Sequence, residues 1–187
     1  EITGQLIIDI TPPYITSIIP ATGQQNPTNQ QPIIFYATFS EPLKDDSLAA
    51  NGFKIKEDGV ITTAKVTEVT SINNKKYTLS VSGIVSQKAS ITVFSPAHTY
   101  QDILGNWNTA EIESSTVTFD KEKPTVTVNQ ADDQVDPTNI NSIKYTVVFS
   151  KPINGDTFVK EDLLISGSST ATVSQLQTVN STTYTVV

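Results

Sequence analysis

Acidic side chains are the residues of this sequence whose types and spacing could do chemistry, and one of them begins the pattern Asp102-Ile103-Leu104-Gly105-Asn106. This spacing is typical of a tight turn in which the Asp carboxylate accepts main-chain N–H groups and Gly105 or Asn106 takes a left-handed conformation. The carboxylate could instead be a calcium ligand, because hard divalent cations prefer carboxylate and carbonyl oxygens. The sequence leaves both interpretations of Asp102 open.

Other carboxylates are predicted to lie near Asp102. In a β-sandwich, the loops after the second, fourth and sixth strands gather at one end of the domain. This arrangement would place Glu41 and Asp102 beside Asp9, with Asp45 or Asp46 as a further neighbour. Calcium takes six to eight oxygen ligands, which several converging carboxylates and carbonyls can supply. We therefore predict a calcium site formed by Asp9, Glu41 and Asp102.

Residue types that enzymes commonly use are scarce. His98 is the only histidine and cysteine is absent, which removes most general-base mechanisms, thiolate chemistry and most zinc sites. No Gly-x-Ser-x-Gly elbow and no Gly-rich phosphate loop occurs. Paired carboxylates could hydrolyse a glycoside, but a thin sandwich offers no deep cleft to shift a carboxyl pKa. We expect a protein that is not an enzyme and that requires no cofactor, with Ca²⁺ as the one candidate ion.

The overall composition excludes further classes. The 187 residues carry a net charge of −7, from 12 basic and 19 acidic residues, and every basic residue is a lysine. No basic stripe is visible, so a nucleic-acid partner is not expected. No apolar run is long enough to span a membrane. Without cysteine, the disulfide-bonded antibody type of domain is excluded as well.

Short runs of alternating apolar residues predict an all-β fold. Ile33, Phe35, Ala37 and Phe39 alternate with more polar neighbours, as in a strand with one face in a core. Asn73-Asn74 separates two such runs and predicts a hairpin over 64–82. No helical periodicity is present, although a helical turn could form near 46–50. Seven strands are predicted, at about 14–19, 33–39, 53–56, 64–70, 76–82, 90–94 and 115–119.

The sequence also repeats itself. PTNQQPIIFYATFSEP at 27–42 matches PTNINSIKYTVVFSKP at 137–152, a separation of 110 residues. VTEVTSINNKKYTLSV at 66–81 matches VSQLQTVNSTTYTVV at 173–187, where the separation falls to 107. Internal repeats of this length indicate one structural unit used more than once.

A third match shows where the units join. LIIDITPP at 6–13 is similar to VTFDKEKP at 117–124, so Asp120 is the counterpart of Asp9. Asp120 is therefore a further candidate calcium ligand, although Lys151 replaces Glu41 in the second copy. We predict a tail strand of a preceding domain at 1–12, a complete domain at 13–120, and the N-terminal part of a truncated domain at 121–187.

These ordered motifs resemble the bacterial immunoglobulin-like (Big) repeats that occur in tandem in large surface proteins, adhesins and S-layer proteins. The resemblance rests on Asp-x-x-Gly-Asn at 102–106, Asp-x-x-x-Pro at 120–124, Asp/Asn-Pro-Thr-Asn at 26–29 and 136–139, and Phe-Ser-x-Pro at 39–42 and 149–152. It implies tandem immunoglobulin-like β-sandwich domains of about seven strands in Greek-key order. It also implies that calcium can be held at junctions between domains.

Two functions are compatible with this resemblance. The first is a structural spacer of an extracellular, cell-surface protein, such as an adhesin, S-layer or filament stalk, whose partners are the neighbouring repeats of the same chain. The second is a binding module for adhesion, which would hold a surface glycan or protein, or assemble with copies of itself into a filament or layer. Trp107 is the candidate for stacking on a sugar, or for covering a domain junction.

Overall fold

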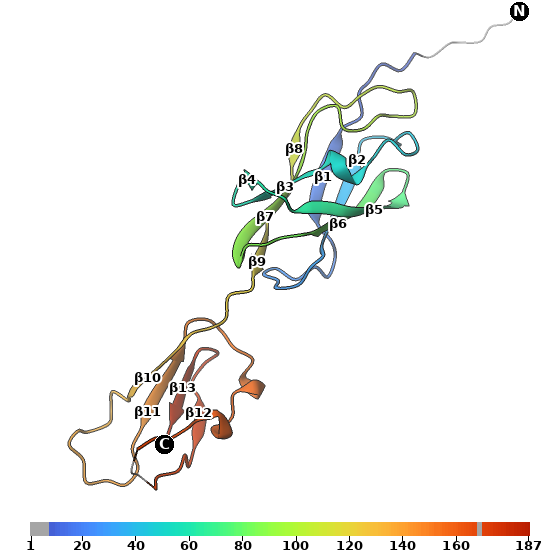
Figure 1. Ribbon diagram of the computed structural model, residues 1–187. Helices are drawn as coiled ribbons and strands as arrows, with labels where there is room; N and C mark the ends of the chain where they lie inside the picture. The colour runs from blue at the N-terminus through green and yellow to red at the C-terminus, as the bar shows by residue number, and fades with distance from the viewer. Residues whose placement is uncertain (1–7, 168–169) are drawn as a thin grey trace, which may run out of the picture. The chain divides into compact units, whose positions relative to one another are not determined.

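The computed structural model describes residues 8–167 and 170–187. The chain divides into two compact units, Glu1–Glu122 and Lys123–Val187, which we call the first unit and the second unit. Figure 1 shows strands throughout both units. The described residues contain three antiparallel sheets, short 3₁₀ turns and no α-helix, which confirms the all-β prediction.

The first sheet of the first unit has the strand order β1-β2-β6-β5. Its central strand β2 buries Ile33, Phe35, Ala37 and Phe39, while the intervening residues stay partly exposed, so the alternation in the sequence becomes the core face. The predicted hairpin between the last two strands is present. The strands are β1 (Ile15–Pro20), β2 (Ile33–Phe39), β5 (Lys65–Asn73) and β6 (Lys76–Ser82).

The second sheet of the first unit is centred on β7, which pairs with β3, β8 and β9. Two of its strands, β4 and β8, are only two residues long and were not predicted. The other three lie where the sequence pattern places them. The strands are β3 (Lys54–Glu57), β4 (Val60–Ile61), β7 (Lys88–Ser95), β8 (Ile112–Glu113) and β9 (Val117–Asp120).

The two sheets of the first unit share one hydrophobic core and so form a β-sandwich. Phe35 from one sheet and Ile91 and Phe119 from the other are all fully buried in it. The loop after β7 adds Tyr100, whose ring packs edge-on against Phe39 with centroids 5.0 Å apart. Burial raises the pKa of Tyr100 to about 12, so this phenol stays neutral in the core.

The second unit contains a single sheet in the order β10-β11-β13-β12. Its small core is built on Val147 and Tyr184, and Phe149, Phe158 and Tyr184 pack edge-to-face. The elements are β10 (Val126–Gln130), β11 (Tyr145–Phe149), β12 (Leu176–Thr178) and β13 (Thr183–Val186), with 3₁₀ turns η2 (Gly155–Thr157) and η3 (Lys160–Asp162).

The predicted boundaries can be placed on this structure. Residues 1–7 of the expected tail strand at 1–12 lie outside the described residues, and residues 8–12 form no strand. The units divide between Glu122 and Lys123, next to the predicted boundary after Asp120. In the part of the chain that the structure describes, no helix is both long and apolar enough to cross a membrane.

Candidate metal centre

The loop from Asp102 to Asn106 follows the structural interpretation of its sequence. Oδ1 of Asp102 accepts the main-chain N–H groups of Leu104 and Asn106, each over 2.8 Å. Gly105 has a φ of +91°, the left-handed conformation that glycine adopts without strain. Asp102 is only 2% exposed, so the turn fixes a buried carboxylate.

Asn106 connects this loop to the N-terminal segment. Its Nδ2 donates to Oδ2 of Asp102 over 2.7 Å and to the main-chain O of Asp9 over 3.2 Å. Oδ1 of Asp9 in turn accepts the N–H of Thr11 over 2.9 Å. In Figure 1 the start of the described chain accordingly lies at the same end of the first unit as the loop after β7. The segment that carries Asp9 is thus held against the loop that carries Asp102.

Glu41 completes a group of three carboxylates. It directly follows Ser40 at the end of β2, and carboxylate oxygens of Asp9, Glu41 and Asp102 lie within 4.8 Å of one another. Burial raises the pKa of Glu41, and the charges of Asp102 and Asp9 raise it further. The charge of Lys75, whose Nζ donates to the main-chain O of Ser40 over 3.0 Å, acts in the opposite direction. Negative charge is therefore concentrated at this point.

The pKa of Asp102 is shifted in the opposite direction to that of Glu41. Burial acts to raise the pKa of Asp102, but hydrogen bonds from Asn106, Leu104 and Gly105 outweigh it, and the net pKa lies below its usual value. The turn thus stabilises an ionised carboxylate at the centre of the group. Each of the three residues offers one carboxylate oxygen, the donor type that calcium prefers, so main-chain carbonyls or water would have to supply the rest of its six to eight ligands.

The other acidic candidates lie outside this group. Asp45 and Asp46 are not part of it, and Asp46 occupies a turn with a φ of 59°. Asp120 ends β9, where its Oδ2 lies 3.6 Å from Nζ of Lys88 and its Oδ1 accepts the N–H of Glu122 over 3.0 Å. Asp120 therefore makes the same local turn as Asp9.

Asn108 is a structural residue of this loop that sequence reasoning did not find. Its side chain is fully buried, and Oδ1 accepts the N–H groups of Thr99 and Tyr100 over 2.6 and 3.1 Å. Its Nδ2 donates to the carbonyls of Pro96 and Ala110. Asn108 thus satisfies buried main-chain groups on both sides of the long loop and positions Asp102 indirectly. An Asn two residues after the Asp-x-x-Gly-Asn pattern was the available signal.

His98 and Trp107 also lie on this loop. His98 has a φ of 56° and its N–H donates to the main-chain O of Asn108, so its backbone takes part in a turn. Trp107 remains 46% exposed, and Ile103 and Leu104 of the same loop are exposed as well. This aromatic ring is accessible for contact with another molecule.

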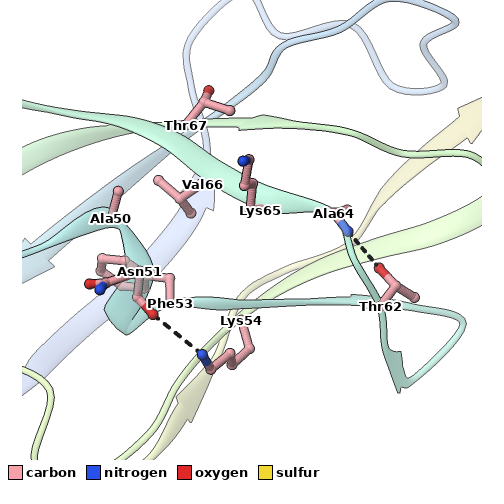
Figure 2. A pocket seen from close by; sticks show the side chains of 9 residues that line it. All are labelled: Ala50, Asn51, Phe53, Lys54, Thr62, Ala64, Lys65, Val66 and Thr67. Carbon is pink, nitrogen blue, oxygen red and sulfur yellow. Dashed lines mark hydrogen bonds between the residues drawn. The ribbon is translucent and has the colours of Figure 1, made fainter.

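A separate hollow of about 440 Å³ lies where the edges of the two sheets of the first unit meet. Figure 2 shows Lys54 and Lys65 on its rim, one from β3 and the other from β5. Nζ of Lys54 donates to the main-chain O of Asn51 over 3.3 Å, and neither Lys54 nor Lys65 has an acidic partner among the described residues. Phe53 and Val66, both buried, contribute to the apolar part of the lining.

Comparison with known proteins gives only distant similarities. No protein-family model and no curated protein matches the chain. A crystal structure of the S-layer protein rSbsC(31-844) has a TM-score of 0.43 at 16% identity, covering 67% of this chain and 16% of that one. The N-terminal part of the bacterial S-layer protein SbsC has a TM-score of 0.42 at 13% identity, covering 75% of this chain and 41% of that one. The chain spans less than half the length of either structure.

Proposed function

We propose that this chain is a structural segment of an extracellular surface protein, built from tandem immunoglobulin-like units that extend or display other parts of that protein. The observation that carries the proposal is a set of hydrogen bonds that recurs in the second unit about 110 residues after the first. Oγ of Ser40 accepts from Tyr14 N over 3.1 Å, and Oγ of Ser150 accepts from Thr125 N over 2.9 Å.

Further recurring bonds support the same proposal. Oε1 of Gln24 accepts from Ile34 N over 2.8 Å, and Oε1 of Gln134 accepts from Lys144 N over 2.9 Å. Side chains that make the same contact at the same spacing are expected from a repeated unit and not from chance similarity of two sheets.

The strand order supports the immunoglobulin-like assignment. Constant-type immunoglobulin domains place strands A, B, E and D in one sheet and C, F and G in the other. When the two-residue strands β4 and β8 are set aside, the first unit has the order β1-β2-β6-β5 in one sheet and β3-β7-β9 in the other. Labelled A to G in chain order, these strands reproduce that Greek-key arrangement.

Calcium binding by Asp9, Glu41 and Asp102 is part of this proposal. Three carboxylates within 4.8 Å repel one another, and the raised pKa of Glu41 reflects its burial and that repulsion. A divalent cation would neutralise the charge and bind the N-terminal segment to the loop after β7. A spacer benefits from this link, because a fixed entry segment limits the motion of whatever precedes the unit.

The proposal includes no catalytic role. Asp102 is held ionised by its turn, and the sequence contains no other histidine than His98. General acid–base catalysis needs a group whose proton can move near neutral pH and that can reach a substrate. The loop instead uses its polar groups to stabilise its own fold.

A second candidate function is a binding module for a surface glycan or a protein. The observation that favours it is the hollow of Figure 2, which places an apolar lining beside the ammonium groups of Lys54 and Lys65. Such a rim suits a ligand with a carboxylate or sulfate group. Assembly of copies of the chain into a layer or filament belongs to the same class of function.

The proposed location can be tested on cells that produce the whole protein. Antibodies raised against these 187 residues should label intact cells, and protease added outside the cells should remove the label. Labelling that requires cell lysis would contradict the proposal.

A further inference from the structure

The turn after β10 has the backbone of the turn after β1 but carries different side chains. In each turn the main-chain N–H of a glutamine, Gln24 or Gln134, donates over 2.9 Å to the alanine carbonyl three residues before it. The first turn reads TGQQN at 22–26 and has no charged residue, whereas the second reads DDQVD at 132–136 and has three carboxylates. The repeated turn does not require these carboxylates for its backbone, which indicates a role at the surface. We call 132–136 the acidic turn.

Two of the three carboxylates of the acidic turn have no cation beside them. Oδ2 of Asp133 lies 2.5 Å from Nζ of Lys144. Asp132 and Asp136, by contrast, form no ion pair among the described residues. Between Asp133 and Asp136, the side chain of Val135 is 67% exposed. The acidic turn therefore presents an apolar side chain next to carboxylates that have no cation of their own.

The hollow of Figure 2 has the complementary chemistry and belongs to the first unit. It lies beside the 3₁₀ turn η1 (Ala50–Gly52), and its lining combines apolar side chains with Lys54 and Lys65. Neither lysine has an acidic partner in the part of the chain that the structure describes. At the repeat separations of 110 and 107 residues their counterparts are Leu164 and Thr172, so the second unit carries neither cation. The lysine pair and the acidic turn each occur in one unit and not in the other.

We infer that the acidic turn of one copy of this chain docks in the hollow of a second copy. The inference rests on the second candidate function, in which this hollow is a binding surface. Val135 would lie against the apolar lining and leave water. The carboxylates of Asp132 and Asp136 would gain the ammonium groups of Lys54 and Lys65 as partners. Because the contact joins two different surfaces, each copy can bind one neighbour through its turn and another through its hollow.

A second copy explains more of the surface than an anionic sugar does. A sugar acid would match the two lysines of the hollow but would leave the acidic turn without a role. A second copy uses both surfaces, and it supplies an apolar side chain for the apolar lining. A five-residue turn in a hollow of about 440 Å³ is a small contact, so the association should be weak and sensitive to salt.

Sedimentation equilibrium of the 187-residue chain tests the contact. The mean mass of the parent should rise with protein concentration at low ionic strength. It should fall back toward the monomer at about 1 M salt, where charges are screened over ~3 Å. We define a hollow variant, Lys54→Glu with Lys65→Glu, and a turn variant, Asp132→Lys with Asp136→Lys. Each alone should associate at least tenfold more weakly than the parent, because like charges then face each other.

Mixing the two variants identifies the surfaces that meet. The hollow variant keeps its acidic turn and the turn variant keeps its hollow, so an equimolar mixture should form a complex. A control with the same change in net charge as the hollow variant, Lys123→Glu with Lys160→Glu, lies outside both surfaces and should change association less than twofold. Circular dichroism verifies that each variant is folded, as expected for substitutions of exposed side chains.

Three results would overturn the inference: a parent chain that stays monomeric, association that survives either charge reversal, and folded variants that fail to form a complex when mixed. A monomeric parent that binds a uronic-acid oligosaccharide at Lys65 would overturn this inference and leave the second candidate function standing. A monomeric parent that binds no such sugar would remove the hollow as a surface for either partner. Calcium titration involves no residue of the two surfaces, so it judges the structural role separately.

Discussion

Asn106 donates to the carboxylate of Asp102 twice, from its main-chain N to Oδ1 over 2.8 Å and from Nδ2 to Oδ2 over 2.7 Å. The same Nδ2 also donates to the main-chain O of Asp9. One side chain therefore stabilises a buried anion and holds the N-terminal segment beside it. The turn at 102–106 therefore lies where the carboxylates of Asp9, Glu41 and Asp102 come together.

The first prediction concerns this link. Asn106→Ala removes the side-chain donor to Asp102 and leaves that buried carboxylate less satisfied, so the free energy of unfolding should fall by about 1–3 kcal/mol. Urea unfolding in EDTA at pH 7, followed by the fluorescence of Trp107, measures the effect on the first unit. Asn74→Ala, in an exposed turn, is the control and should stay within about 0.5 kcal/mol of the parent chain. Equal losses in both variants would contradict the assigned role.

The fold was predictable where side chains alternate. Apolar residues at every second position, Ile33, Phe35, Ala37 and Phe39, indicate a strand with one buried face. The structure has β2 at the predicted bounds, with these four residues buried. Strands β4 and β8 have two residues each, too few for any period to show. They form because the neighbouring strands β3 and β7 offer free main-chain groups to pair with. Such pairing depends on the three-dimensional arrangement and leaves no local pattern in the sequence.

The candidate site was predictable in part, for a similar reason. Strand count brought Asp9, Glu41 and Asp102 to one end of the unit, because topology decides which loops share an end. Strand count could not show that Asp45 lies outside this group, since the exact path of a loop depends on its own hydrogen bonds. The link through Asn106 and the buried position of Asn108 arise from contacts that no sequence period encodes.

The second prediction is a pH dependence caused by Glu41. Its pKa is raised above the usual 4.5, so the native state binds more protons than the unfolded state between 4.5 and the raised value. Its contribution to stability is therefore present at low pH and is lost as the pH rises through that window. Glu41→Gln should remove this loss, so that without calcium the variant is more stable than the parent at pH 7. Identical slopes of stability against pH in the two proteins would argue against a raised pKa of Glu41.

The third prediction tests the sandwich core. Ile18 and Ile19 are adjacent in β1, but the first is 2% exposed and the second is 46% exposed. Ile18→Ala should lower the free energy of unfolding by about 2–5 kcal/mol through the cavity that it leaves. Ile19→Ala should cost less than about 1 kcal/mol. Urea unfolding read by Trp107 fluorescence compares them, and a larger effect at Ile19 would show that the faces of β1 are assigned wrongly.

The fourth prediction concerns the second candidate function. If the hollow between β3 and β5 binds anionic sugars, a uronic-acid oligosaccharide should shift NMR signals of Lys65 and Thr67. Lys65→Ala should weaken that binding at least fivefold, because it removes one of the two rim cations, the other of which, Lys54, already donates to the main-chain O of Asn51. Lys160→Ala, on the second unit, is the control and should have no effect. The absence of any shift would exclude this ligand class at the hollow and leave the structural role unaffected.

Calcium titration tests the central claim most directly. Isothermal titration of the 187-residue chain should show one site, with a dissociation constant of about 0.1–1 mM, the range of extracellular calcium modules. At ten times that concentration the first unit should gain about 1.4 kcal/mol of stability. The double variant Asp9→Asn with Glu41→Gln should lose both effects, whereas Asp45→Asn with Asp46→Asn should keep them. No heat of binding, or binding that survives in the first double variant, would contradict a metal-stabilised entry segment.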